Sequence, residues 1–181
     1  MNSRRQFIGL SSIGILSSLI PFQGFSADKS TFEGLVVNVE EGETVMIRNG
    51  TTILRIKVSK TQGSQSVSFL SESILPGEGI PVHKHLNEDE LIFIHKGSGV
   101  FTIGEKQFAV TEGAVAVVPK AVWHALQNTG KENLEMRFAY TPSGFEGFFR
   151  EVGTPAGKPF VKKTKEEKDI LAKKWGIVYK V

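Results

Sequence analysis

Short stretches of alternating apolar and polar residues dominate the middle of the chain, over about residues 32–142. The stretch 134–140 is the clearest, because every second residue is large and apolar and both Glu135 and Arg137 lie between them. Successive side chains of a β-strand point to opposite faces. The alternation therefore predicts a strand with one buried face and with Arg137 directed outward.

Further strand-like segments are separated by Gly, Pro and Asn, which favour turns. Asn49-Gly50 predicts a two-residue hairpin turn between two of them. The predicted strands are 35–39, 45–48, 51–58, 65–75, 90–95, 100–103, 107–110, 114–118, 123–128 and 134–140. Nine or ten short strands at regular spacing are typical of an all-β sandwich or barrel.

The periodicity changes after Pro142. Phe145, Phe148 and Phe149 fall on one face of a helix and are expected to pack that helix against the barrel.

A second helix is predicted over Lys163–Trp175, with Thr164 as its N-cap and Gly176 after its end. No linker is long enough to separate a further domain. The predicted organisation is one domain over 28–181, with a barrel over about 32–142 and a helical extension over about 143–181.

Residues 1–27 follow the pattern of an export signal. Arg4 and Arg5 precede an apolar stretch over 8–20, which is shorter than the roughly 20 residues that a membrane span needs. The start, Ser-Arg-Arg-x-Phe, resembles a twin-arginine signal peptide, which implies export of an already folded protein. The expected location is the periplasm or the extracellular space, with no stable membrane anchor after removal of the signal.

Composition excludes several classes of site. The chain contains no Cys, which excludes disulfides, thiolate zinc sites and Cys nucleophiles. Residues 28–157 hold twelve Lys and Arg against sixteen Asp and Glu, a charge of −4, whereas 158–181 hold eight Lys against three acids, a charge of +5. Nucleic-acid-binding surfaces cluster basic and aromatic residues on one face. A basic tail on an acidic body therefore predicts no nucleic-acid partner.

Three histidines and one glutamate are candidate metal ligands. His83 and His85 are two residues apart, so a strand would direct both imidazoles to the same face. Glu90 follows at an odd separation, and a bend is needed to bring its carboxylate to that side. His124 comes after a break at Pro119. Imidazole and carboxylate donors without sulfur suit Mn, Fe, Co, Ni, Cu or Zn better than Ca.

These residues fall within two spaced motifs. The first reads Gly-x5-His-x-His-x4-Glu-x6-Gly over 77–97, and the second reads Gly-x5-Pro-x-Ala-x2-His-x3-Asn over 113–128. Both resemble the motifs of the cupin superfamily, in particular small single-domain type-2 cupins that are often labelled quercetinase-like. Ala121 departs from the second motif, where Gly is usual. The resemblance implies a jelly-roll-like barrel that binds one divalent metal through His83, His85, Glu90 and His124.

Other polar and apolar residues are weaker candidates. Glu88 and Asp89 are alternatives to Glu90 as the carboxylate ligand, although only Glu90 has the motif spacing. His95 is expected on the surface. Three residues are candidates to line an apolar pocket above the metal, or to belong to the ordinary barrel core: Phe101, Met136 and Phe138.

Four protein ligands on a six-coordinate metal leave two positions for a bidentate substrate, or for a substrate and O₂. The first hypothesis is therefore a metal-dependent, dioxygenase-like oxidoreductase that acts on a small electron-rich diol or enol. The alternatives are a non-enzymatic metal-loaded barrel that binds a sugar or another small molecule, and a metal-dependent isomerase or lyase. An oxalate-type decarboxylase is disfavoured, since it would need a second cupin domain or extra cationic groups near the metal.

Export in the folded state bears on the identity of the metal. By affinity alone such a ligand set prefers Cu²⁺ or Zn²⁺ to Mn²⁺ or Fe²⁺. A chain that folds in the cytoplasm, where Cu and Zn are buffered, can load a weaker-binding metal first. Mn or Fe is therefore expected, with Ni, Cu and Zn as alternatives. The expected partners are a small-molecule substrate, O₂ and a second copy of the chain in a homodimer.

Overall fold

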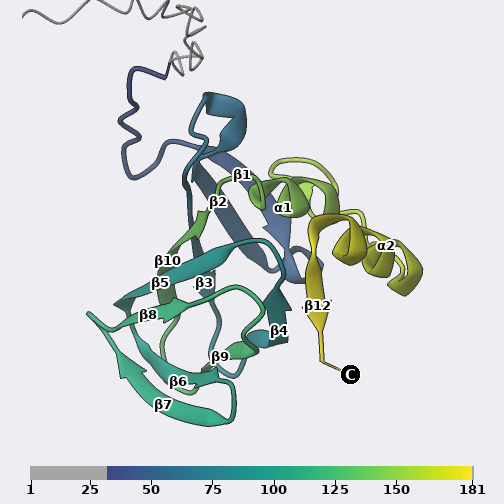
Figure 1. Cartoon of the computed structure of the whole chain (residues 1–181). Helices are drawn as coiled ribbons and strands as arrows, with labels where there is room; N and C mark the ends of the chain where they lie inside the picture. Colours follow the sequence, from purple (N-terminus) through teal and green to yellow (C-terminus); the bar gives the residue numbers. More distant parts are fainter. Residues whose placement is uncertain (1–31, 181) are drawn as a thin grey trace, which may run out of the picture. The chain divides into compact units, whose positions relative to one another are not determined.

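The computed structural model describes residues 32–180, and the predicted export signal over 1–27 lies outside the described residues. All strand pairs described are antiparallel, and they form two sheets (Figure 1). In sheet order, the larger sheet comprises β11 (Thr154–Pro155), β1 (Glu43–Ile47), β2 (Thr52–Val58), β3 (Ser68–Ile74), β10 (Leu134–Thr141), β5 (Asp89–Lys96) and β8 (Val115–Val118). The smaller sheet comprises β12 (Ile177–Tyr179), β4 (Gly79–His85), β9 (His124–Asn128), β6 (Ser98–Ile103) and β7 (Lys106–Thr111).

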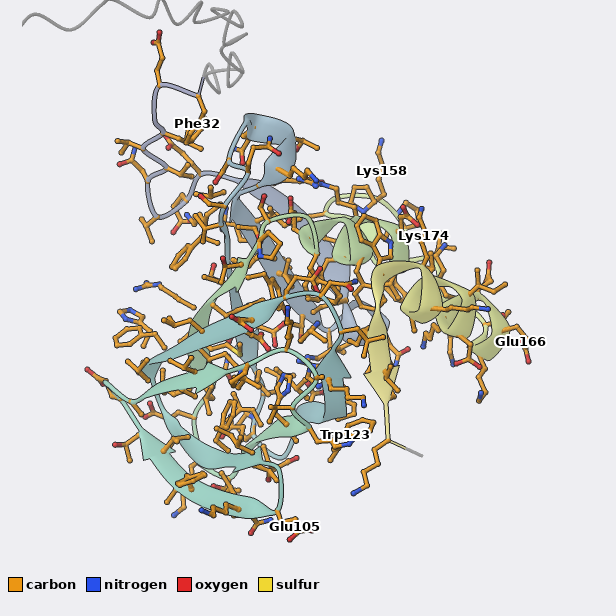
Figure 2. All side chains as sticks on the ribbon, viewed as in Figure 1. Phe32, Glu105, Trp123, Lys158, Glu166 and Lys174 are labelled. Carbon is orange, nitrogen blue, oxygen red and sulfur yellow. The ribbon has the colours of Figure 1, made fainter. Side chains whose placement is uncertain are left out.

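Two helices follow the barrel strands, α1 (Glu146–Val152) and α2 (Lys165–Trp175). The all-β prediction with one or two C-terminal helices is confirmed. Figure 2 shows Glu166 and Lys174 projecting from α2, whereas Glu105 lies at the β6–β7 turn, away from the helices. Within residues 32–180, neither helix has the length and the apolar composition needed to cross a membrane.

The core combines buried side chains from both sheets in one cluster. The alternation of β10 buries Leu134, Met136 and Phe138, each at most 2% exposed. On its opposite face, Arg137 hydrogen-bonds to the exposed His95. The sequence had predicted an outward Arg137 and a surface His95. Full burial of one such apolar side chain contributes about 1.5–3 kcal/mol. The barrel therefore has a source of stability that does not depend on a metal.

Two predictions for the first strands are wrong. Residues 35–39 form no strand, and Val36 is 85% exposed, because this β-branched run has no neighbouring strand to pair with. The turn between β1 and β2 has four residues, since Ile47 pairs with Thr52. Arg48 takes a left-handed φ of 50° instead of continuing the strand. Its guanidinium donates hydrogen bonds to Gly79 and Glu72.

The helical extension packs through a close contact between its two helices. A Cβ atom at Gly147 in α1 would collide with the ring of Trp175 in α2, so only glycine fits there. The predicted N-cap of α2 is confirmed, because Thr164 and Glu167 form a reciprocal capping box. Gly176 ends the helix in the left-handed conformation, with φ 69°.

The chain after α2 returns to the barrel as β12, which the sequence did not indicate. Ile177 pairs with His85 and Tyr179 with His83. A three-residue strand carries too little alternation to be recognised in the sequence. Its position matters, because it pairs with the strand that carries two of the four candidate metal ligands.

Candidate metal centre and its cavity

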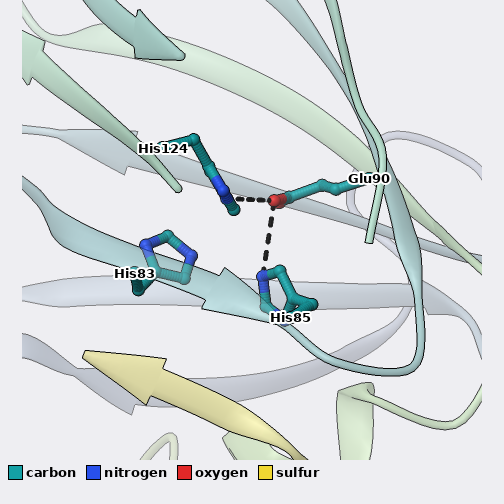
Figure 3. A group of neighbouring side chains, drawn as sticks. All are labelled: His83, His85, Glu90 and His124. Carbon is teal, nitrogen blue, oxygen red and sulfur yellow. Dashed lines mark hydrogen bonds and ion pairs between the residues drawn. The ribbon is translucent and has the colours of Figure 1, made fainter. Parts of the chain in front are cut away.

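The four candidate ligands come from two facing sheets (Figure 3). His83 and His85 lie on β4, and His124 lies beside them on β9, where it is paired with His83. Glu90 lies on β5 of the other sheet. All four side chains are buried, and one donor atom from each lies within 4.8 Å of the others. The fold therefore brings the whole predicted set together.

The bend expected before Glu90 occurs where the chain changes sheets. β4 ends at His85 and β5 begins at Asp89. Leu86, within the bend, donates its backbone N–H to the carbonyl of Gly176 over 2.8 Å. Because Glu90 approaches from the opposite sheet, its odd separation from the histidines does not direct it away from them.

Backbone carbonyls fix the orientation of two imidazoles. The Nδ1 of His83 lies 2.8 Å from the carbonyl oxygen of Pro81, and the Nδ1 of His124 lies 3.0 Å from that of Val122. A carbonyl only accepts, so both Nδ1 atoms must carry the proton. With the proton on Nδ1, Nε2 is the ring nitrogen that each imidazole offers to a metal.

Electrostatics favours neutral imidazole beside an ionised carboxylate. Burial, together with the neighbouring His124 and His85, lowers the pKa of His83 to about 3, so this ring is neutral at ordinary pH. Burial alone would raise the pKa of Glu90. The adjacent His124 and His85 imidazoles outweigh it and hold that pKa well below its ordinary value.

The donor set fits a bound cation. The Nε2 of His124 lies 2.9 Å from Oε2 of Glu90, and the Nε2 of His85 lies 3.5 Å from the same oxygen. With the proton of His124 on Nδ1, its Nε2 and the carboxylate are two acceptors facing each other, and a cation between them would satisfy both. Both ring nitrogens of His85 are also buried without a hydrogen-bond partner in the described part of the chain. The cluster therefore fits a metal site.

The alternative carboxylates lie outside this cluster. Asp89 is exposed, and its Oδ1 accepts the backbone N–H of Lys120 over 2.8 Å. Glu88 is buried apart from the histidines, and burial raises its pKa to about 7. Only Glu90 is placed to act as the fourth ligand.

A cavity of about 500 Å³ adjoins the cluster and is lined by His83, His85 and Glu90. Met136 and Phe138 line it, as the sequence analysis suggested. Phe101 does not line it. That side chain is 1% exposed and stacks on the ring of His124, with 6.4 Å between centroids. The helical segment supplies a further aromatic wall that the sequence analysis interpreted only as a docking face: Phe145, Phe148 and Phe149.

Arg48 is a cavity residue that sequence reasoning missed. Its guanidinium donates to the carbonyl of Gly79 over 2.6 Å and to Oε1 of Glu72 over 2.7 Å. Burial raises the pKa of Glu72, and the Arg48 charge only partly offsets this effect. No signal could have placed Arg48 here, because both partners lie more than 20 residues away in the sequence.

Four lysines also line the cavity, and they too were not predicted as site residues: Lys162, Lys163, Lys165 and Lys168. Three are exposed and Lys163 is half-buried, so the cavity meets solvent beside them. We call these four residues the basic mouth. The sequence analysis treated them only as part of a basic tail.

Comparison with known proteins was made on sequence and on structure. A family model described as a cupin domain matches residues 70–140. An oxalate-binding protein from Thermotoga maritima is 33% identical over 67 residues, which are 37% of this chain and 55% of that protein. YrkC of Bacillus subtilis is 32% identical over 72 residues, 36% of this chain and 39% of that protein. These matches therefore span about half, or less, of the curated relatives' length.

Solved structures give the same picture of the fold. A predicted oxalate decarboxylase from Thermotoga maritima has a TM-score of 0.54 at 25% identity, over 60% of this chain and 99% of that one. KdgF from Halomonas sp. also has a TM-score of 0.54, at 12% identity, over 63% and 98% of the two chains, and this likeness concerns the fold alone. The described barrel has the cupin jelly-roll fold, and the domain match together with these neighbours supports the cupin superfamily for this chain.

Proposed function

We propose that this chain is a metal-dependent oxidoreductase that binds a small electron-rich molecule and adds O₂ to it. One observation carries the proposal: three histidines and a glutamate, fit to hold a divalent metal, line or adjoin a largely apolar cavity of about 500 Å³. Cavities of roughly 300–1,000 Å³ suit small organic ligands.

The side chains of the site have separable roles. Three neutral imidazoles and one carboxylate would hold the ion, and Glu90 would offset one of its two charges. When bound, a divalent transition metal supplies an electrophilic centre with open positions for substrate and O₂. The carbonyls of Pro81 and Val122 keep two imidazole rings in place. The aromatic wall would hold the apolar body of the substrate and exclude water from the reacting end.

A second candidate, binding or decarboxylation of a small dicarboxylate, is favoured by a different observation. The sequence predicted neither a second cupin domain nor cationic groups near the metal, which disfavoured this activity. In the structure, however, Arg48 and the basic mouth line the same cavity as the metal cluster. The relatives from Thermotoga maritima are described as an oxalate-binding protein and a predicted oxalate decarboxylase. Oxalate has no apolar part, however, and would leave the aromatic wall without a partner.

One experiment separates these functions. Protein loaded in turn with Mn²⁺, Fe²⁺, Ni²⁺ and Cu²⁺ is incubated with a catechol, a flavonol and oxalate, while O₂ uptake and CO₂ release are followed. O₂ uptake with the catechol or the flavonol supports the oxidoreductase. Release of CO₂ from oxalate without O₂ uptake supports the second candidate. Tight binding of oxalate without turnover would support the binding form of the second candidate. Tight binding of the catechol or the flavonol without turnover would overturn the oxidoreductase and leave a binding protein.

The proposal extends to export and metal identity. The twin-arginine-like start supports export of the folded protein to the periplasm or beyond, loaded with Mn or Fe. Rerouting the chain through an unfolded-export signal should change the metal found in the purified protein. The same metal by both routes, or native protein that carries Cu or Zn, would remove the argument for Mn or Fe.

A further inference from the structure

The cavity lining combines three kinds of side chain. They are three residues of the metal cluster, the basic mouth and the aromatic wall. Five cationic side chains line it against three carboxylates. Two of those carboxylates are paired with cavity cations, Glu72 with Arg48 and Asp169 with Lys165. The third is Glu90, in the metal cluster.

Three lysines of the basic mouth are left without an acidic partner. Among the ion pairs of residues 32–180, none involves Lys162, Lys163 or Lys168. A divalent ion at the cluster would add further positive charge to the same cavity. Like charges gathered around one cavity raise the local concentration of anions. The charge distribution therefore selects for a negatively charged ligand.

The aromatic wall constrains the rest of that ligand. Phe145, Phe148 and Phe149 pack with ring centroids 5.3–5.7 Å apart and form a continuous apolar surface on the cavity. A small inorganic anion, or one composed only of carboxylates, would not cover this surface. Burying apolar ligand area against it contributes about 25 cal/mol per Å².

We propose that the cavity binds an amphipathic carboxylate: an oxygen-donor head at the metal cluster, an aromatic or alkyl body against the aromatic wall, and a carboxylate at Lys162, Lys163 and Lys168. This inference rests on the proposed function, which assigns the oxygen-donor head as the part of the ligand that reacts. It goes further by naming the chemical class of the substrate. The three lysines are then specificity-determining residues that do not touch the reacting atoms.

The test compares two matched probes without O₂, so that no turnover is needed. Binding of 3-(3,4-dihydroxyphenyl)propionate and of its neutral amide to the metal-loaded protein is measured by calorimetry. The two probes share the catechol head and the body and differ only in charge at the far end. The wild-type protein should prefer the carboxylate by about tenfold, since exposed ion pairs are individually weak and three act together.

The variant Lys162→Gln/Lys163→Gln/Lys168→Gln should lose this preference and bind both probes about equally. A matched control, Lys158→Gln/Lys173→Gln/Lys180→Gln, removes the same charge from lysines that do not line the cavity, and it should keep the preference. Lys158 lies on the segment before α2, as Figure 2 shows.

Four results would overturn the inference. They are equal binding of both probes by the wild type, failure of the carboxylate probe to bind at millimolar concentration, survival of the preference in the mouth variant, and its loss in the control. Survival in the mouth variant would mean that the carboxylate binds the metal and not the lysines. Admitting O₂ afterwards tests the proposed function separately. A preference without O₂ uptake leaves the substrate class standing and removes the oxidation.

Discussion

The metal cluster and the basic mouth line one cavity but are built in different ways. The cluster uses four buried residues between His83 and His124, all inside the segment 70–140 that matches the cupin domain. The basic mouth and the aromatic wall lie after that segment, and Arg48 lies before it. The centre therefore lies in the part of the chain that matches the cupin domain. The surroundings that would select a substrate come from outside the matched segment.

The difference extends to how the two regions are held. Backbone carbonyls and facing sheets fix the cluster, so its geometry follows from the barrel itself. The mouth lies on α2 and on the segment before it, outside the barrel strands. Changes in the cluster should therefore alter metal binding, whereas changes in the surroundings should alter stability and specificity and leave the metal in place.

Loss of a ligand should have the largest effect. His83→Ala and His124→Ala should each weaken metal affinity by more than the roughly 10- to 100-fold cost of losing an outer hydrogen-bond partner. Elemental analysis after dialysis measures this, with His95→Ala as an exposed control. Equal metal content in wild type and ligand variants would show that the cluster is not the metal site.

Removal of one aromatic ring should test whether the two regions are separable. Phe148 is 5% exposed and borders the cavity on one side, so Phe148→Ala should reduce the free energy of unfolding by about 3 kcal/mol. The metal content of the folded protein should not change. Denaturant titration and metal analysis of the same preparation provide both values. Loss of metal in the folded variant would mean that the wall supports the cluster.

The charge of Glu90 should matter more for metal than for folding. Glu90→Gln keeps size and polarity but removes the charge that offsets the ion, so metal affinity should fall about tenfold or more. The free energy of unfolding of the metal-free protein should change by less than about 1 kcal/mol, because apolar burial stabilises the barrel. Metal titrations measure the affinity and melting curves measure the stability of the wild type and of Glu90→Gln, with Glu88→Gln as the matched control. A weaker site in the control and an unchanged one in Glu90→Gln would identify Glu88 as the ligand.

The pair Arg48–Glu72 should make stability depend on pH. Because burial raises the pKa of Glu72 in the folded protein, the native state holds this proton more tightly than the unfolded chain does. Stability is therefore lost as pH rises above the ordinary glutamate value of 4.5. Arg48→Met removes the cation that opposes this shift, so the loss should extend to higher pH and become larger.

Melting temperatures of wild type and Arg48→Met at pH 5 and pH 8 would reveal the effect. The variant should be destabilised by about 2 kcal/mol at pH 8, and by less at pH 5. Arg55→Met is the control, because Arg55 pairs with the exposed Glu40. An equal loss at both pH values would indicate that Arg48 contributes packing and not charge.

The smallest effect is expected at the residue that departs from the second motif. Ala121 has a left-handed φ of 64°, a conformation that favours glycine. Its N–H donates to the carbonyl of His85 over 2.6 Å, which ties the turn to the ligand strand. Ala121→Gly should therefore stabilise the protein by about 0.5–1 kcal/mol and leave metal affinity unchanged. Thermal unfolding of the two proteins measures it, and destabilisation would show that the methyl group packs favourably.

The sequence by itself determined the elements with strong periodic or capping signals. Alternation predicted β10, and the N-cap Thr164 and the following glycine predicted α2 within two residues of its start. The two motifs also indicated the four cluster residues, since His83 and His85 share a strand face whatever surrounds them. These features depend on local rules that apply within a few residues of chain.

Only the tertiary structure decided which further side chains meet at the cavity. Arg48 reaches Glu72 on β3, 24 residues away in the sequence, and β12 pairs with β4 although more than 90 residues separate them. Leu35–Val39 has a strand-like composition but gains no partner, while Ile177–Tyr179 has almost no pattern and forms one. Strand pairing and cavity lining are long-range contacts, so their stability depends on what the rest of the fold places opposite each residue.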